Sequence, residues 1–187
     1  VENGRANAER FAATATFLQA DLLTLQLGEK FDVVYTWGVL HHTQDARASF
    51  LRLASHVAPG GEMIVAVYLK TALSGFWNAS RILYQVAPSW GKRAFCSGGA
   101  IALAGVDQVK RVVSGSSRYM MRGTRNEELI ADWFGVPQRT FHTYDEVFGW
   151  CREAGLEPVL WKRWTGRFRS TSNFVVRAKA PRAEVVH

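Results

Sequence analysis

The chain has 187 residues, of which 48% are apolar and 21% are charged, and it carries a formal net charge of +7 at pH 7. These values are typical of one globular domain with a hydrophobic core, and they exclude a disordered tail. The positive charge favours anionic partners such as nucleic acid or phosphorylated metabolites, although it bears on association rather than on fold.

Cysteine usage and hydropathy predict the cellular environment. Cys96 and Cys151 stand far apart, with no CxxC or Cys/His spacing around them. The pattern therefore indicates neither a disulfide framework nor a zinc site. No apolar run reaches about 18 residues, and the N-terminus lacks the layout of a signal peptide. We expect a soluble, cytoplasmic protein that does not use a membrane.

The first part of the chain predicts a helix, a short strand and a long buried strand. Apolar residues recur at helical spacing in residues 1–13, which predicts a helix already under way at Val1. The run "ATFLQADLL" predicts a strand over residues 15–19, with Asp21 in the loop that follows. The run "FDVVYTW" (31–37) leaves neither face polar, as expected for a parallel strand covered by helices on both sides.

The next segments predict a β-α-β unit. The long strand ends at Gly38 and leads through two adjacent histidines to a helix that Thr43 or Asp45 can cap. The sequence "APGG" (58–61) predicts a tight turn out of that helix and into an apolar strand over residues 62–69. Strands joined in this way lie parallel, with a right-handed connection.

A long irregular segment follows this unit. Residues 70–137 scatter aromatic side chains among glycine, serine and basic residues, and they are too many for a plain loop. We therefore expect a helical insertion. Its clearest helix covers residues 125–134 and begins near Asn126.

The C-terminal part returns to regular patterns. Thr143 and Glu146 have capping-box spacing ahead of an amphipathic helix. Residues 159–164 and 171–180 then predict two strands that pair as an antiparallel hairpin.

Candidate functional residues follow the predicted strands, because ligands of open α/β sheets gather at the carboxyl ends of the strands. They are Asp21, the pair His41 and His42, and the region of Tyr68. Each has an ordinary structural explanation as well. An acid after a strand often caps a helix, and adjacent histidines without a third partner make poor metal ligands and often simply lead into a helix.

The order of the segments is more specific than any one of them. "FLQADLL", "FDVVYTWGVLHHT", "LASHVAPGGEMIVAV" and "FHTYDEVFGWCREAGLEPV", followed by a terminal strand pair, resemble the class I S-adenosylmethionine-dependent methyltransferases, in particular the small-molecule methyltransferase-like group. The resemblance covers about residues 3–69 and 140–180. It implies an α/β, Rossmann-like sheet in one methyltransferase domain, residues 1–187, with an insertion or lid over residues 70–137.

The resemblance also implies a cofactor site for S-adenosylmethionine. Asp21 matches the acid that accepts a hydrogen bond from the adenine amino group, and Leu22 matches the neighbour that packs on the ring. Trp37 and Gly38 match the strand end that approaches the methionine part, where glycine gives room.

Catalytic and substrate-binding roles follow in the same way. His41 and His42 are candidates for the base that takes a proton from the methyl acceptor, a small molecule. Alignment of the acceptor with the methyl group can also accelerate the transfer without a base. Tyr68, Tyr119 and Arg122 are candidates for substrate binding, although aromatic residues of the insertion more often serve packing.

The sequence departs from the family where the glycine-rich turn should stand. Nothing before residue 15 can supply that turn or the acid that grips the ribose, so we expect an N-terminally truncated domain that lacks its first two strands. Their loss would uncover the backbone edge of strand 31–37. We expect this edge either to recruit a second copy of the chain or to take up residues 15–19.

A second interpretation is a noncatalytic, methyltransferase-like binding module that uses basic C-terminal strands on nucleic acid. These charges lack a platform of stacking aromatic residues, so a solvated hairpin is favoured over a nucleic-acid site. The basic residues are Lys162, Arg163, Arg167, Arg169, Arg177 and Lys179.

Overall fold

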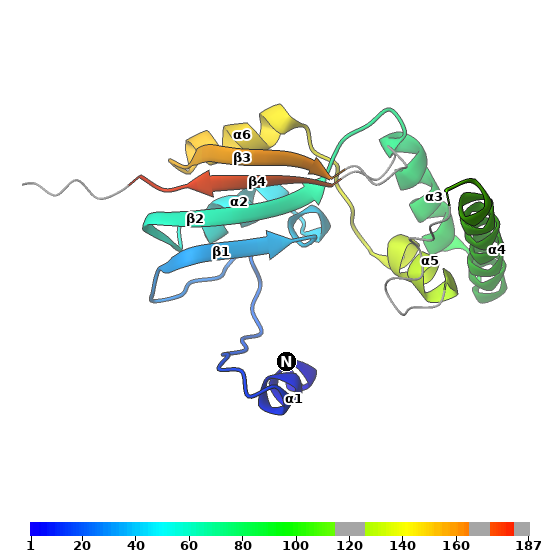
Figure 1. Ribbon diagram of the computed structural model, residues 1–187, viewed down its shortest axis with the longest axis horizontal. Coiled ribbons are helices and arrows are strands. Elements are labelled where there is room, and N and C mark those ends of the chain that lie inside the picture. The colour runs from blue at the N-terminus through cyan, green and yellow to red at the C-terminus, as the bar shows by residue number, and fades with distance from the viewer. Residues whose placement is uncertain (115–125, 165–172, 182–187) are drawn as a thin grey trace, which may run out of the picture.

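A computed structural model describes residues 1–114, 126–164 and 173–181 of the chain. Its centre is a four-stranded sheet of β1 (Phe31–Trp37), β2 (Val57–Tyr68), β3 (Glu157–Trp164) and β4 (Asn173–Lys179). The strand order is β1-β2-β4-β3 (Figure 1). β1 and β2 are parallel, whereas β4 is antiparallel to both of its neighbours. The predicted α/β fold and its C-terminal antiparallel pair are confirmed.

The predicted β-α-β unit is present, and its helix begins as expected. After β1, the short 3-10 turn η1 (Leu40–His42) leads into α2 (Ala46–Ala54). Asp45 caps α2, because its side chain accepts a hydrogen bond from the backbone N–H of Ala48 at 2.9 Å.

The segment "APGG" behaves differently from the prediction. Residues 58–61 are not a turn ahead of the strand, because β2 already begins at Val57, and the segment forms an irregularity in the pairing with β1. Gly60 has a φ of +77°. A Cβ on Gly61 would lie 2.9 Å from the Asp32 carbonyl oxygen, so glycine lets the two backbones approach closely.

The main hydrophobic core lies on one face of the sheet, under α2 and α6 (Tyr144–Glu153) (Figure 1). Thr143 and Glu146 form the predicted capping box at the start of α6. Phe50 of α2 and Val147 of α6 are fully buried against Met63 of β2. These two helices therefore fix the positions of β1 and β2.

The other face of β1 is open, so the prediction of cover on both faces was wrong for this strand. Val33 is 57% exposed, and Tyr35 and Trp37 are exposed beside it, whereas Val34 and Thr36 are buried on the opposite face. In the described parts of the chain, α2 and α6 pack on one face only, and β1 pairs only with β2. The edge of β1 is therefore free.

The predicted strand over residues 15–19 was also wrong. This segment is neither helix nor strand, and it did not move in beside β1. The Phe17 ring instead lies against Gly4 of α1 (Glu2–Arg10), a helix that stands away from the sheet (Figure 1). A short apolar run forms a strand only if a neighbouring edge supplies backbone hydrogen bonds, and residues 15–19 have no such neighbour here.

Between β2 and α6 the described residues form three helices: α3 (Ser74–Val86), α4 (Ser89–Ser114) and α5 (Asn126–Gly135). They pack around a second apolar cluster in which Tyr84, Ile130 and Phe134 are buried. Figure 1 places them beyond the carboxyl ends of β1 and β2. No helix in the described ranges combines the length and the apolarity needed to cross a bilayer.

Candidate functional site

The ends of β1 and β2 form a surface that is open to a ligand. Gly38 has a φ of +75°, and its N–H donates to the Ala66 carbonyl of β2 at 3.1 Å. Apart from its two chain neighbours, no described residue has an atom within 4 Å of the position that a Cβ on Gly38 would occupy. Trp37 is 39% exposed beside it. The tip of β1 therefore has room for a molecule to approach its backbone.

The two adjacent histidines occupy very different environments. η1 is closed by the Thr43 hydroxyl, which donates to the Leu40 carbonyl at 2.7 Å. The turn directs His41 inward, where it is fully buried and its ring stacks on Tyr68 with centroids 3.9 Å apart. Neither ring nitrogen has a hydrogen-bond partner in the described residues. Burial, followed by the charge of His42, lowers the pKa of His41 to about 3.

His42 is only partly buried and has a defined ring orientation. Its Nδ1 lies 2.8 Å from the carbonyl oxygen of Gln138. Because a carbonyl only accepts, Nδ1–H is the donor, and Nε2 of the neutral ring keeps its lone pair. Of the two predicted histidines, His42 is therefore the one that can offer a lone pair to a bound molecule.

An extended segment, residues 138–142, joins α5 to α6 and crosses the ends of both parallel strands. The Thr140 N–H donates to the His41 carbonyl at 2.8 Å, and the His142 N–H donates to the Tyr68 carbonyl at 2.8 Å. The Lys70 N–H donates in turn to the His142 carbonyl at 2.9 Å. This segment therefore fixes the histidine turn relative to the end of β2.

The side chain of His142 belongs to the same hydrogen-bond network. Its Nε2 lies 2.8 Å from the Thr140 hydroxyl, and its Nδ1 lies 3.4 Å from a carboxylate oxygen of Glu146. Burial lowers the pKa of His142, and Glu146 acts in the opposite direction. Sequence reasoning missed the network, because its members lie about a hundred residues from the histidine pair and no spacing pattern connects them.

Asp21 and Leu22 lie in a turn ahead of β1. The Asp21 carboxylate is exposed, and one oxygen accepts from the Leu23 N–H at 2.9 Å. Among the described residues nothing else bonds to this carboxylate, so its second oxygen can accept from a ligand. Leu22 packs against the main core. Of the three predicted substrate-binding residues, Tyr68 lies at the end of β2, whereas Tyr119 and Arg122 lie outside the described residues.

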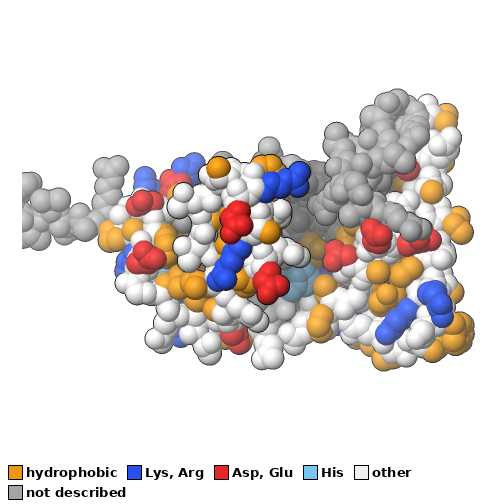
Figure 2. Space-filling view, turned by 90° about the horizontal axis from the view of Figure 1, so that it is seen from below, with side chains coloured by type: hydrophobic (Ala, Val, Ile, Leu, Met, Phe, Trp, Pro, Cys, Tyr) orange, Lys and Arg blue, Asp and Glu red, His pale blue; other side chains and the backbone are white. Residues whose placement is uncertain are grey.

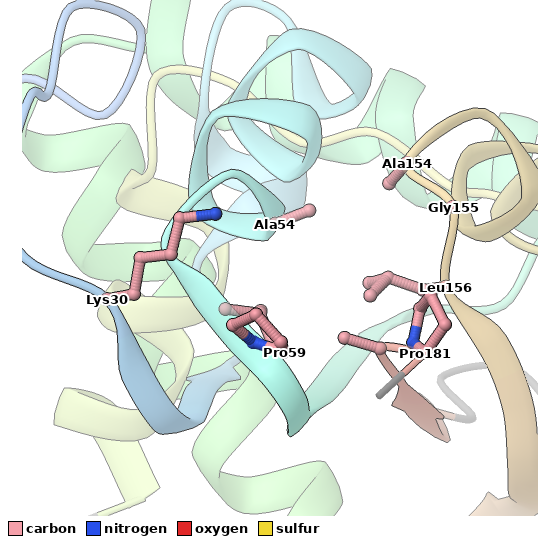
Figure 3. Close-up of a pocket in the computed structure, with 9 residues that line it drawn as sticks. Lys30, Ala54, Pro59, Ala154, Gly155, Leu156 and Pro181 are labelled. Carbon is pink, nitrogen blue, oxygen red and sulfur yellow. The ribbon is translucent and has the colours of Figure 1, made fainter. Parts of the chain in front are cut away.

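Two hollows among the described residues lie away from these strand tips. A hollow of about 380 Å³ opens between the start of β1 and the end of α6, with Lys30, Pro59 and Leu156 in its lining (Figure 3). A second hollow of about 340 Å³ is lined by Gln26 and His56. Figure 2 shows histidine side chains in the recess between the sheet part and the helical part of the molecule.

One basic residue of the C-terminal strands forms an ion pair with a neighbouring strand. Arg177 is held by Glu62 of β2 through two hydrogen bonds, of 2.7 and 2.5 Å. Its charge is therefore engaged within the sheet. The side chains of Lys162, Arg163, Arg167 and Arg169 lie outside the described residues.

The chain is similar to known proteins in sequence and in structure. Over 72 residues the chain is 38% identical to uncharacterized methyltransferases of Mycobacterium tuberculosis and Mycobacterium bovis. The matched segment makes up 37% of this chain and 36% of each relative. The chain thus matches just over a third of the length of these relatives.

Solved structures share the fold at low sequence identity. The magnesium protoporphyrin IX methyltransferase of Synechocystis PCC 6803 with bound SAH has a TM-score of 0.53 and 19% identity, over 96% of this chain and 59% of that chain. The 1,6-didemethyltoxoflavin-N1-methyltransferase of Burkholderia thailandensis has a TM-score of 0.52 and 15% identity, over 95% of this chain and 56% of that chain.

A family model described as a methyltransferase domain matches residues 3–159, which include β1, α2, β2 and the histidine turn. This match and the shared fold lead to one conclusion: the chain belongs to the methyltransferase domain family, with the sheet of a class I S-adenosylmethionine-dependent methyltransferase.

Proposed function

We propose that this protein is an S-adenosylmethionine-dependent methyltransferase that acts on a small molecule, and that methyl transfer takes place at the carboxyl ends of β1 and β2. One observation carries the proposal. Within the segment that matches the methyltransferase domain, these strand ends combine the open Gly38 tip, Tyr68, and the partly exposed His42 ring, whose Nε2 has no hydrogen-bond partner among the described residues.

We assign the cofactor to Trp37 and Gly38 at the tip of β1 and to Asp21 in the turn ahead of β1, which suit it in type and in exposure. Gly38 lets a ligand approach the backbone, and Trp37 offers an exposed ring beside it. The free oxygen of Asp21 suits the adenine amino group, since a carboxylate accepts from an exocyclic amine. Leu22 adds an apolar contact next to it. When bound, S-adenosylmethionine supplies a methyl group on a positively charged sulfur atom.

His42 is the residue that we assign to proton transfer. Its Nε2 can take the proton that a hydroxyl or amine of the acceptor gives up, because Nδ1–H is already held by Gln138. His41 does not reach the acceptor from its buried position, so its role is to support Tyr68 from behind. Tyr68 contacts the acceptor, and the helices α3–α5, which Figure 1 places beyond the strand ends, serve as a lid over it.

Calorimetric titration with S-adenosylhomocysteine tests the proposal. We expect saturable binding that weakens about tenfold in Trp37→Leu, which corresponds to about 1.4 kcal/mol. The matched control is Trp90→Leu, since Trp90 is 73% exposed on α4 and lies outside the proposed site. Absence of binding to the unsubstituted protein would contradict the function, and equal affinity in both variants would contradict the site. Salt-dependent binding of a DNA oligonucleotide in its place would support the noncatalytic alternative.

A further inference from the structure

Arg139 is a buried cation that forms no ion pair with the described residues. Only 8% of its surface is exposed, and in the described ranges no carboxylate lies within ion-pair distance of its guanidinium. A charge removed from water is costly unless a counter-charge or several hydrogen bonds compensate for it. The described residues supply only part of that compensation.

Two contacts hold the guanidinium in place. One terminal nitrogen donates to the Trp133 carbonyl in the last turn of α5, and the guanidinium carbon lies 5.3 Å from the centre of the Tyr68 ring. The Nε–H is buried and has no hydrogen-bond partner among the described residues. A donor group of this kind is unsatisfied until an acceptor reaches it.

A second cation, Arg81, influences the charge of Arg139. Arg81 donates at 2.5 Å to the carbonyl of Pro137, which lies two residues before Arg139 in the chain. Burial lowers the pKa of Arg139 and the charge of Arg81 acts in the same direction, while Tyr68 and the exposed Asp132 oppose them. A carboxylate bound at Arg139 would form charge-assisted hydrogen bonds with the guanidinium and would offset the repulsion from Arg81.

Arg139 also lies next to the proposed proton acceptor. Tyr68 is the common neighbour, because the His42 ring centre is 6.0 Å from the Tyr68 ring centre and Arg139 lies over the same ring. An anionic group held by Arg139 would therefore belong to the molecule that His42 deprotonates, rather than to a distant site.

We propose that Arg139 binds a carboxylate of the methyl acceptor, so that the substrate class is a small carboxylic acid. This inference rests on the proposed function. The competing explanation is that Arg139 merely ties down the end of α5 through the Trp133 carbonyl. Glutamine could make that single hydrogen bond, whereas only a guanidinium offers a charged fork to a carboxylate.

NMR titration of the arginine Nε–H signals tests the proposal on the full chain. Acetate and benzoate are the probes, and benzamide is the neutral counterpart of benzoate. We expect benzoate and acetate to shift the Arg139 signal in a saturable manner, with benzamide at least tenfold weaker. Signals of surface arginines such as Arg47 should stay in place. Failure of both acids to shift the Arg139 signal in the unsubstituted protein overturns the proposal without any mutation.

Two variants separate the binding role from the structural role. Arg139→Gln should lower benzoate affinity at least tenfold and leave the circular dichroism spectrum unchanged. Arg81→Gln is the matched control, since it removes a neighbouring charge that also bonds to a carbonyl of this segment, and we expect its affinity to fall less. Equal benzoate affinity in Arg139→Gln and the unsubstituted protein overturns the proposal, as does a stronger response to inorganic phosphate than to either acid.

Titration of the same samples with S-adenosylhomocysteine keeps the two proposals apart. Benzoate binding at Arg139 without S-adenosylhomocysteine binding contradicts the proposed function and leaves the carboxylate site standing. Binding of S-adenosylhomocysteine without any response of Arg139 to the acids contradicts the carboxylate site alone.

Discussion

Replacement of His41 by leucine should remove a large part of the acid sensitivity of the fold. The His41 ring is fully buried and uncharged, and its pKa is lowered from 6.5 to about 3. In the unfolded chain the same imidazole takes up a proton at its ordinary pKa. Below pH 6.5 the unfolded state therefore binds more protons than the folded state, and stability falls as the pH falls.

The size of this effect follows from the two pKa values. At pH 5 the imidazole of the unfolded chain is protonated, while the buried imidazole is still neutral. Between pH 6.5 and pH 5 the free energy of unfolding therefore falls by roughly 2 kcal/mol, at 1.36 kcal/mol per pH unit. His41→Leu lacks this contribution. It also removes two buried nitrogens that have no hydrogen-bond partner among the described residues, and each such group costs about 1–3 kcal/mol. We therefore expect the variant to be at least as stable as the unsubstituted protein at pH 7.5.

Urea unfolding followed by tryptophan fluorescence at pH 7.5 and pH 5 measures the effect. The unsubstituted protein should lose roughly 2 kcal/mol more than His41→Leu between the two values. Val147→Ala is the control, because it removes fully buried apolar volume without a titratable group and should lower stability equally at both pH values. An equal pH-dependent loss in His41→Leu and the unsubstituted protein would refute the assignment of a buried, neutral His41.

Four further predictions follow from the structure. Gly61→Ala should destabilise the fold by more than about 2 kcal/mol in urea unfolding, because its Cβ would meet backbone oxygens at 2.9 Å. Gly98→Ala is the control, since this position in α4 has open space around it, and it should stabilise the fold by about 0.5–1 kcal/mol. Asp45→Ala should cost about 1 kcal/mol through loss of the α2 cap, and Asp32→Ala, which removes an exposed acid from β1, serves as its control. His42→Gln should slow methyl transfer about 10²-fold with little change in S-adenosylhomocysteine affinity, and an unchanged rate would contradict its role as base. Val33→Lys should reduce self-association through the β1 edge, as measured by sedimentation velocity, while Val109→Lys on α4 should not. An unsubstituted protein that is already monomeric would contradict edge pairing.

Local signals in the sequence were sufficient for much of the fold. A capping residue acts on backbone groups within one turn. The sequence therefore predicts a helix capped by Thr43 or Asp45, of which Asp45 caps α2, and Thr143 with Glu146 predicts the start of α6. The apolar runs of β1 and β2 and the helix between them were enough to predict a parallel pair.

Features that depend on distant partners could not be predicted in this way. The run over residues 15–19 has strand composition, but a strand needs a neighbouring edge, and sequence composition does not show whether one is present. Likewise, the apolar pattern of β1 is compatible with cover on both faces, and only the packing of α2 and α6 shows that Val33 and Tyr35 are exposed.

The candidate site was predictable by position and not by role. The sequence located the histidine pair at the end of β1, because ligands gather where parallel strands end. It could not show that His41 and His42 have different environments. That difference arises from contacts with Gln138 and Thr140, which follow α5 and lie about a hundred residues away in the sequence. Arg139 was missed for the same reason.

The central claim is that the carboxyl ends of β1 and β2 bind the methyl donor. A titration of the ¹⁵N-labelled chain with S-adenosylhomocysteine, followed by amide and indole NMR signals, tests it most directly. The account predicts saturable shifts that centre on Trp37, Gly38 and His42. Shifts that centre instead on Gly155 and Leu156, beside the hollow at the opposite end of the sheet, or no saturable shifts at all, would contradict it.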